Sequence, residues 1–309
     1  MQGQEAARLW GPLRRRAIKA ACRGVQVMIV ALLLNPVFGP SAWSQDRGIE
    51  DVFCDGDLAP FCTRQGMRFF DRFTSERTDM ARRTAYLERA TFFFASACNA
   101  GDMRGCVYYG DYFKNYDSES TERRRHRRAA ELYQTACAGG DMMGCIRLGD
   151  EYYSGTGVPQ DEAKATASYR KACDGGHDKG CYLVGISYSK GQGVEQRAAG
   201  AAEFFNRACD LGHAMGCLRA GTYFAHGLGV DANLDMARDR YRRACDGGHE
   251  QACTDLGMLY AQPGGIDQDR RLARMFFERG CSIAVDAQVA DNSRACLRHR
   301  LFGGEEIAP

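Results

Sequence analysis

Cysteines recur in this chain at one fixed separation. Six pairs have members eight residues apart, and the first cysteines of successive pairs, with Cys281 as the last, follow at intervals of 44, 39, 36, 36, 36 and 36 residues. The pairs are Cys54 with Cys62, Cys98 with Cys106, Cys137 with Cys145, Cys173 with Cys181, Cys209 with Cys217, and Cys245 with Cys253. A period of about 20 to 50 residues is the signature of stacked supersecondary units. The pattern therefore predicts a solenoid of repeats that each span 36 residues, with longer variants at its start.

Other residues keep the same register and predict the first helix of each repeat. A glycine recurs four residues after the second cysteine and an aromatic residue seven after it, so the three share one helical face. They are Gly149 with Tyr152, Gly185 with Tyr188, Gly221 with Phe224, and Gly257 with Tyr260. Gly-x-Gly elements follow at Gly155, Gly191 and Gly227. Because they end a helix rather than open one after a strand, we expect turns and not phosphate-binding loops.

A second helix is predicted in each repeat from alanines with an aromatic residue four positions later. The pairs are Ala165 with Tyr169, Ala201 with Phe205, Ala237 with Tyr241, and Ala273 with Phe277. No segment alternates with a period of two over a useful length, so the fold class is predicted to be all-α.

The cysteines are predicted to form disulfides. Residues eight apart on one continuous helix are separated by about 12 Å, which is beyond disulfide reach. Asp174-Gly175-Gly176 breaks the helix, so Cys173 at the end of one helix can meet Cys181 at the start of the next. Cys281 and Cys296 are the seventh predicted pair, and no Cys-x-x-Cys favours zinc instead. Fourteen paired cysteines indicate an oxidising compartment.

The first 44 residues are predicted to be a signal peptide. Arginines and a lysine precede an apolar stretch at residues 27–34, and Ala42-Trp43-Ser44 offers small residues before cleavage at Gln45. The chain is therefore expected in the periplasm or outside the cell. An Arg-rich mitochondrial presequence, leading to the intermembrane space in a eukaryote, is the alternative.

Composition narrows the function classes. The chain has 309 residues and a formal charge of +2, but residues 1–44 contribute six basic residues and one acid. The remaining 35 basic and 38 acidic residues give about −3, so nothing global indicates nucleic-acid binding. No apolar run reaches the roughly 18 to 20 residues of a membrane span.

One repeat in particular resembles a known family. Gly180-Cys181, Gly185, Tyr188, Gly191-Gln192-Gly193-Val194, Ala201 and Ala208-Cys209 resemble a Sel1-like repeat, which is related to the tetratricopeptide repeat. The cysteine pairs are similar to those of the cysteine-rich secreted proteins known from Helicobacter. The resemblance implies a right-handed superhelix of αα-hairpins that acts mainly as a protein-interaction scaffold, and it implies β-lactam binding or slow hydrolysis in some members.

The resemblance divides the chain into four parts. After the leader, residues 45–97 form a degenerate N-terminal repeat or cap that lacks the Gly-x-Gly turn. Residues 98–280 hold the regular repeats. Residues 281–309 form a C-terminal cap with the wider cysteine spacing.

No catalytic residue is assigned, although β-lactam hydrolysis is kept as the alternative function. Serine β-lactamases carry Ser-x-x-Lys, which occurs here at Ser168 with Lys171 and at Ser187 with Lys190. The companion Ser-Asp-Asn and Lys-Thr-Gly motifs are absent. Ser168 adjoins the core residue Tyr169, and Ser187 falls late in a helix, where no helix N-terminus supplies oxyanion donors.

Two further groups of residues have competing interpretations. His177, His213 and His249 recur one repeat apart, too far apart for a shared metal, so they are interpreted as polar residues of the turn entering the first helix. No metal or cofactor is expected. Arginines at 123–125, 127 and 128 either meet an anionic partner or form a solvated helix start, and the second interpretation is favoured.

Helical phase places a candidate binding groove. Positions two, six and nine after the second cysteine lie at about 200°, 240° and 180° from it, opposite the cysteine–glycine–aromatic stripe. The residues predicted to line this groove are Arg147, Glu151, Lys190, Arg219, Tyr223 and Asp255. The resemblance implies that this face lines the concave groove. Its mixed charge suits an extended peptide, a protein or a peptidoglycan fragment, while an ordinary solvated face is the alternative.

Overall fold

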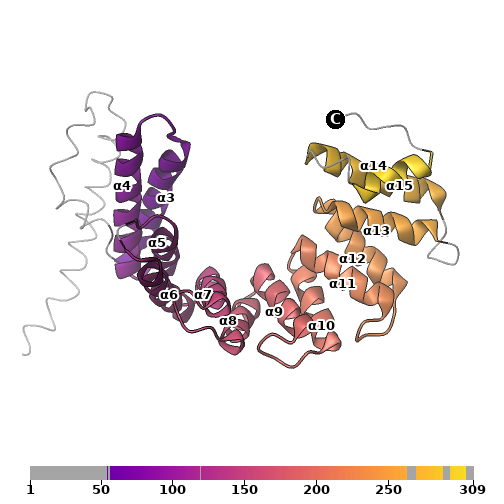
Figure 1. Ribbon diagram of the computed structural model, residues 1–309, viewed down its shortest axis with the longest axis horizontal. Coiled ribbons are helices and arrows are strands. Elements are labelled where there is room, and N and C mark those ends of the chain that lie inside the picture. Colours follow the sequence, from indigo (N-terminus) through magenta and orange to yellow (C-terminus); the bar gives the residue numbers. More distant parts are fainter. Residues whose placement is uncertain (1–53, 55, 119, 263–268, 288–292, 304–309) are drawn as a thin grey trace, which may run out of the picture. The chain divides into compact units, whose positions relative to one another are not determined.

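The computed structural model describes residues 54, 56–118, 120–262, 269–287 and 293–303, and these form helices and their connections without any strand (Figure 1). The predicted leader lies outside these residues. The elements are η3 (Gly56–Leu58), α3 (Ala59–Ser75), α4 (Met80–Asn99), α5 (Met103–Asn115), α6 (Glu122–Ala138), α7 (Met142–Ser154), α8 (Glu162–Asp174), α9 (Asp178–Lys190), α10 (Ala198–Asp210), α11 (Ala214–His226), α12 (Leu234–Asp246), α13 (Glu250–Ala261), α14 (Arg270–Asp286) and α15 (Arg294–Leu301).

Each helix packs against the one that follows it in the chain, from α3 to α15. Odd-numbered helices from α3 to α13 are the first helices of repeats, and the even-numbered helices from α4 to α14 are the second. The prediction of an all-helical αα-hairpin solenoid is therefore confirmed.

The recurring glycine allows the two helices of a repeat to approach closely. A methyl group on Gly185 would lie 2.5 Å from the ring of Phe205, which is only 2% exposed. The same contact joins Gly110 to Tyr133, Gly149 to Tyr169, Gly221 to Tyr241 and Gly257 to Phe277. Gly66 meets Phe94 in the same way, so α3 and α4 form an equivalent hairpin although their sequence lacks the Gly-x-Gly turn.

The residue five positions after the second cysteine differs according to whether the buried aromatic residue of the second helix is tyrosine or phenylalanine. Where the aromatic residue is tyrosine, its hydroxyl donates to a polar side chain. These bonds are Tyr133 to Asp111 at 2.7 Å, Tyr169 to Asp150 at 2.8 Å and Tyr241 to Thr222 at 3.4 Å. Where it is Phe205 or Phe277, the matching residue is Ile186 or Met258. A buried hydroxyl without a partner is costly, so the two positions must change together.

The Gly-x-Gly turns serve both chain reversal and contact between repeats. Gly191 ends α9 in the left-handed conformation, with φ of 73°. Gly193 has φ of 66° and lies against the backbone of Glu162 and Ala163, at the start of α8 in the preceding repeat. Only glycine combines this conformation with so close an approach.

All seven predicted disulfides form, which confirms the predicted pairing. The bonds join Cys54 to Cys62, Cys98 to Cys106, Cys137 to Cys145, Cys173 to Cys181, Cys209 to Cys217, Cys245 to Cys253 and Cys281 to Cys296. The five from Cys98 to Cys253 join the second helix of one repeat to the first helix of the next, with Cα atoms 4.3 to 4.7 Å apart. These cross-links therefore connect consecutive repeats.

The sequence predicts that a disulfide joins the end of one helix to the start of the next. The third bond agrees with this prediction, and the first bond differs from it. Cys145 of α7 is 0% exposed and is bonded to Cys137 near the end of α6, as the prediction for a broken helix requires. Cys62 of α3 is also 0% exposed, but its partner Cys54 precedes the short helix η3. The Cα atoms of this pair are 5.6 Å apart. The bond at Cys62 therefore fastens the segment before α3 rather than a preceding α-helix.

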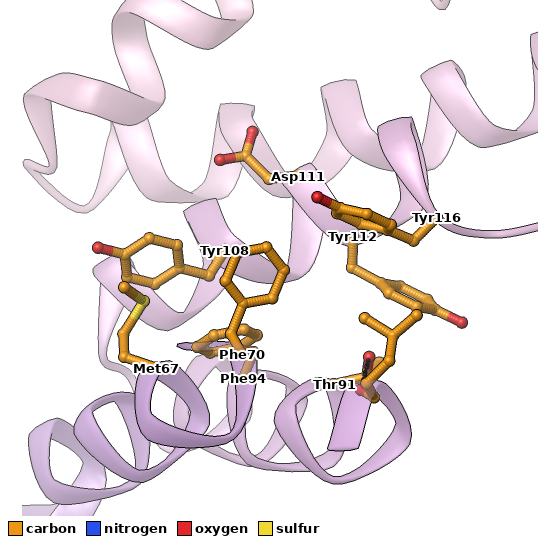
Figure 2. A pocket seen from close by; sticks show the side chains of 9 residues that line it. Met67, Phe70, Thr91, Phe94, Tyr108, Asp111, Tyr112 and Tyr116 are labelled. Carbon is orange, nitrogen blue, oxygen red and sulfur yellow. Dashed lines mark hydrogen bonds between the residues drawn. The ribbon is translucent and has the colours of Figure 1, made fainter. Parts of the chain in front are cut away.

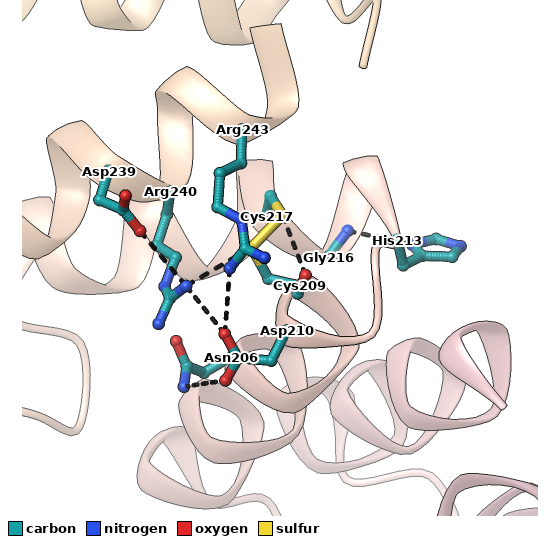
Figure 3. The surroundings of a disulfide bond; sticks show 9 residues. All are labelled: Asn206, Cys209, Asp210, His213, Gly216, Cys217, Asp239, Arg240 and Arg243. Carbon is teal, nitrogen blue, oxygen red and sulfur yellow. Dashed lines mark hydrogen bonds and ion pairs between the residues drawn. A yellow bond between two sulfur atoms is a disulfide. The ribbon is translucent and has the colours of Figure 1, made fainter. Parts of the chain in front are cut away.

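Ion pairs accompany the disulfides between repeats. Beside the bond from Cys209 to Cys217, Asp210 accepts hydrogen bonds from Arg240 at 2.9 Å and from Arg243 at 3.1 Å (Figure 3). Arg243 follows Asp210 by 33 residues. The same separation of 33 residues occurs in the contacts that join Arg207 to Asp174 and Arg279 to Asp246. The pairs of Arg207, Arg243 and Arg279 are exposed and contribute about 0 to 1 kcal/mol each, so they mainly orient neighbouring repeats, whereas Arg240 is buried at 8% exposure.

Within the described part of the chain, no helix combines the length and apolarity that a bilayer crossing requires.

Candidate functional site

The first helix of each repeat has only a narrow face left for ligands. Each of α5, α7, α9, α11 and α13 packs against its own second helix and against that of the preceding repeat. Position six after the second cysteine lies at the contact with the second helix of the preceding repeat. Glu151, Ser187 and Leu259 occupy it and are buried, while Tyr112 and Tyr223 are half-buried. The prediction that position six faces a groove is therefore wrong for Glu151.

Glu151 is fully buried and holds the preceding repeat. Its carboxylate lies 2.8 Å from Lys114 Nζ of α5 and 2.8 Å from His126 Nδ1 of α6, and it accepts a hydrogen bond from Thr156 at 3.1 Å. A carboxylate without solvent requires such partners. The helical phase of α7 alone does not reveal that Glu151 is buried, because the residues that cover it lie on α5 and α6.

Tyr223 also serves the contact between repeats. Its ring lies edge-on to that of Phe205 in α10, with centroids 5.4 Å apart. In the preceding repeat, Ser187 is 4% exposed and bonds to Thr166 of α8 at 2.9 Å. The predicted separation of Tyr223 from the core is therefore incorrect, since its ring completes the packing around Phe205.

Positions two and nine form the face that remains accessible, which we call the open face. At position two it comprises Tyr108, Arg147, Leu183, Arg219 and Asp255, and at position nine Asn115, Ser154, Lys190, His226 and Gln262. All five residues at position nine are exposed. The side chains on this face change in charge and size from one repeat to the next.

The predicted groove residues on the open face differ in their interactions with other side chains of the chain. Arg147 Nε lies 3.2 Å from Asp111 Oδ1 and is therefore paired. Asp255 is half-buried and accepts a hydrogen bond from Gln251 at 2.7 Å, and partial burial raises the pKa of its carboxyl group. Lys190 and Arg219 are exposed and form no ion pair with another described residue. They are the accessible cations of this face.

The two Ser-x-x-Lys motifs do not form a catalytic arrangement. Ser168 donates to the carbonyl of Lys164 in its own helix at 2.8 Å. Ser187 is buried and donates to the Leu183 carbonyl at 3.2 Å, whereas Lys190 is exposed. Among the described residues, no hydrogen bond joins either hydroxyl to its lysine.

The recurring histidines occupy helix N-caps, as the turn interpretation predicts. They precede α9, α11 and α13, where Asp102 and Asp141 precede α5 and α7. His213 Nδ1 accepts a hydrogen bond from the Gly216 amide at 3.1 Å, and its ring stacks on Tyr182 at 4.6 Å. No cluster of metal-ligating side chains occurs in the portion that the structure describes.

Replacing His213 with aspartate is expected to reduce the loss of stability in mild acid. Burial lowers the pKa of His213, so folding favours the neutral ring that caps α11. Its contribution is complete above the ordinary histidine pKa of about 6.5 and is lost as the pH falls through the lowered value. His213→Asp retains an acceptor throughout, so about 1 kcal/mol of cap stability should persist in urea unfolding at pH 5. Parallel pH profiles for the two proteins would contradict this account.

The arginine cluster is only partly available to a partner. Arg125 Nη1 donates to the Asp117 carbonyl at 3.1 Å, and Arg128 lies over the ring of Phe113 at 5.0 Å. His126 is bound to Glu151. Arg123, Arg124 and Arg127 are exposed at the start of α6. Arg125 and Arg128, together with His126, therefore contribute to the fold.

These features define a class of protein, a disulfide-linked αα-solenoid with a variable open face. The Sel1 repeat model matches residues 106–141, 143–177, 178–213, 214–249 and 250–282. The chain belongs to the Sel1 repeat family, whose fold is typical of protein-interaction scaffolds.

Solved structures share the fold. A protective antigen present in uropathogenic Escherichia coli strains, with an SLR fold, is 25% identical, with a TM-score of 0.65 over 81% of this chain. The match spans 50% of the antigen's own length. A Sel1 repeat protein from Oxalobacter formigenes is 18% identical, with a TM-score of 0.55 over 72% of this chain and 84% of that protein. Helicobacter pylori cysteine rich protein B is 30% identical over 44% of this chain and 98% of its own, with a TM-score of 0.38. A search of curated proteins found no match.

Proposed function

We propose that this protein is an exported scaffold that binds an extended peptide or a protein segment along the open face of α5 to α13. The observation that carries the proposal is the contrast between the repeating packing positions and positions two and nine, which vary from repeat to repeat, with position nine exposed in all five of these helices. A linear series of distinct side chains on consecutive repeats suits a linear ligand. The seven disulfides support export, because such bonds persist in oxidising compartments such as the periplasm or the extracellular space.

Lys190 and Arg219 indicate that the ligand carries acidic residues. Both are exposed and have no ion pair within the described chain, whereas Arg147 is neutralised by Asp111. Unpaired cations on a binding face attract and orient acidic segments. We therefore expect acidic side chains of the ligand to contact α9 and α11.

Charge reversal of these two residues tests the proposal. Lys190→Glu/Arg219→Glu should weaken capture of a partner from periplasmic extract by at least about tenfold, since two attractive contacts become repulsive. The measurement is quantitative cross-linking mass spectrometry with purified oxidised protein as bait. Thermal stability should change little, because neither side chain is packed in the core.

The matched control is Lys171→Glu/Arg274→Glu, which makes the same change in net charge on exposed positions of the second helices α8 and α14. It should capture the partner as the wild type does. Equal capture by both double variants would refute binding on the open face, as would cross-links confined to Arg123, Arg124 and Arg127. Capture of peptidoglycan fragments without any protein would refute a peptide ligand.

A further inference from the structure

Arg240 of α12 is buried beside the disulfide between Cys209 and Cys217, which links α10 to α11 (Figure 3). The residue is only 8% exposed, and its Nη1 lies 4.0 Å from Cys209 Sγ. The same nitrogen is 2.9 Å from a carboxylate oxygen of Asp210 and 3.3 Å from one of Asp239. Two carboxylates therefore hold a guanidinium group against one sulfur of a buried disulfide.

The cation is specific to this bond. Arg240 stands five residues before Cys245, and the corresponding residues of α6, α8, α10 and α14 are Leu132, Ser168, Phe204 and Phe276. None of these is charged, so the four other bonds between repeats have no guanidinium at the equivalent position. Arg207 approaches Cys173, but its Nη2 donates to the backbone carbonyl and not to the sulfur. Since leucine or phenylalanine fills the position elsewhere, packing does not explain the arginine.

The guanidinium of Arg240 is incompletely satisfied while the disulfide is intact. Its Nε is buried without a hydrogen-bond partner among the described residues, and a neutral sulfur is only a weak acceptor for Nη1. Such a buried donor is costly. A thiolate at Cys209 is a charged acceptor, and charge-assisted hydrogen bonds are roughly twice as strong as neutral ones. The surroundings therefore suit reduced Cys209 better than the disulfide.

The other charged groups around the bond leave this preference in place. Asp210 also accepts a hydrogen bond from Arg243 at 3.1 Å, and the side chains of Asp210 and Asp239 are more than half exposed, so water solvates both carboxylates. His213 turns its ring away from the sulfurs (Figure 3), and burial lowers its pKa, so it is neutral at neutral pH and above. Of these groups, Arg240 alone has a hydrogen-bond contact with a cysteine sulfur.

Cys217 suits the opposite role, that of a protonated thiol. Its Sγ lies 3.6 Å from the carbonyl oxygen of Cys209, to which an S–H group donates a weak hydrogen bond. The same arrangement occurs at Cys145, Cys181 and Cys253, so it is a general property of the array. The special feature of this bond is therefore the cation beside Cys209.

We propose that the bond between Cys209 and Cys217 is a redox-active disulfide, which dithiol reductants cleave at equilibrium in preference to the other bonds between repeats. One thiol of the reductant attacks Cys217, the more accessible sulfur at 3% exposure, and Cys209 leaves as a thiolate beside Arg240. The second thiol then displaces Cys217, which takes up one proton. The products are one thiolate, one thiol, the cyclic disulfide of the reductant and one released proton. This inference does not depend on the proposed ligand.

Equilibration with mixtures of reduced and oxidised dithiothreitol at about pH 8 tests the proposal. Thiols are trapped with an alkylating reagent, and each cysteine is scored by peptide mass spectrometry. The equilibrium constant for reducing Cys209–Cys217 should be at least about tenfold larger than for any of the four other bonds between repeats, a difference of about 30 mV in potential. A constant equal to or smaller than theirs would overturn the proposal.

The pH dependence of this constant shows whether a thiolate forms. While the thiols of dithiothreitol remain protonated, release of one proton raises the constant by up to about tenfold per pH unit. Bonds reduced to two thiols release no proton, so their constants should change little between about pH 6 and pH 8, below the ordinary cysteine pKa of about 8.5. A constant for Cys209–Cys217 that is equally insensitive to pH would contradict the role of Arg240.

Arg240→Met removes the guanidinium and keeps an unbranched apolar chain. It should lower the constant for Cys209–Cys217 by at least about tenfold and remove its pH dependence. Arg243→Met is the matched control, because it removes another arginine bound to Asp210 on the same helix and should leave both properties unchanged. No effect of Arg240→Met, or an equal effect of both variants, would refute the proposal. If Arg240→Met does not fold, the pH dependence of the wild type decides.

Discussion

Replacing Cys209 with serine is expected to lower the free energy of unfolding by about 2 to 5 kcal/mol, the range found when native disulfides are removed. Cys209 and Cys217 are 0% and 3% exposed, and their bond joins α10 to α11. The variant loses this cross-link and buries a hydroxyl among apolar groups. Urea unfolding under non-reducing conditions measures the change.

Thiol counting supplies the accompanying control. Wild-type residues 45–309, isolated under oxidising conditions, should show no reactive thiol after denaturation, whereas Cys209→Ser should expose one from Cys217. Several free thiols per wild-type chain would contradict the observed pairing. A stability equal to that of the wild type would mean that the cross-link constrains little.

Replacing Gly193 with alanine is expected to destabilise the protein by about 2 to 5 kcal/mol. The left-handed conformation costs an alanine about 1 to 2 kcal/mol, and overpacking adds about 1 to 3 kcal/mol. The new methyl group would collide with the backbone of Glu162 and Ala163, which cannot rotate away as a side chain could. The fall in urea midpoint, converted with the measured slope, gives the value.

Gly176 provides a matched control for this collision. It also has a positive φ, of 83°, but no atom lies within 4 Å of an added methyl group. Gly176→Ala should therefore show only the conformational cost, about 1 to 2 kcal/mol. If the two variants lose equal stability, the close approach of the turn to α8 contributes nothing.

Repetition made the fold predictable. Because each packing position occurs several times, the second cysteine, Gly185 and Phe205 could be recognised by register alone, and the disulfides followed from the break after Cys173. The repeats also contain two side-chain pairings that the register of single positions does not reveal. The residue at the position of Asp111 changes together with the one at the position of Tyr133, and an aspartate such as Asp210 precedes an arginine such as Arg243 by 33 residues. Comparing repeats position by position would have revealed both pairings.

The candidate site was less predictable because it depends on neighbouring repeats. Phase around one helix correctly separates Lys190 and Arg219 from the core stripe. It cannot show that Glu151 is covered by Lys114 and His126, since those residues belong to the preceding hairpin. A recess lined by Met67 of α3, Phe94 of α4 and Tyr108 of α5 was missed for the same reason (Figure 2). Three helices from two repeats form it, and no single segment carries its pattern.

The order of the disulfides bears on how the chain matures. Each bond joins two cysteines that follow one another directly in the described sequence, and none encloses another. A chain that enters an oxidising compartment with its N-terminus first can close each bond before the next cysteine pair arrives. Non-native pairing, which must be undone by slow thiol exchange, then has few opportunities. Stepwise oxidation would add one finished repeat at a time to a growing folded array.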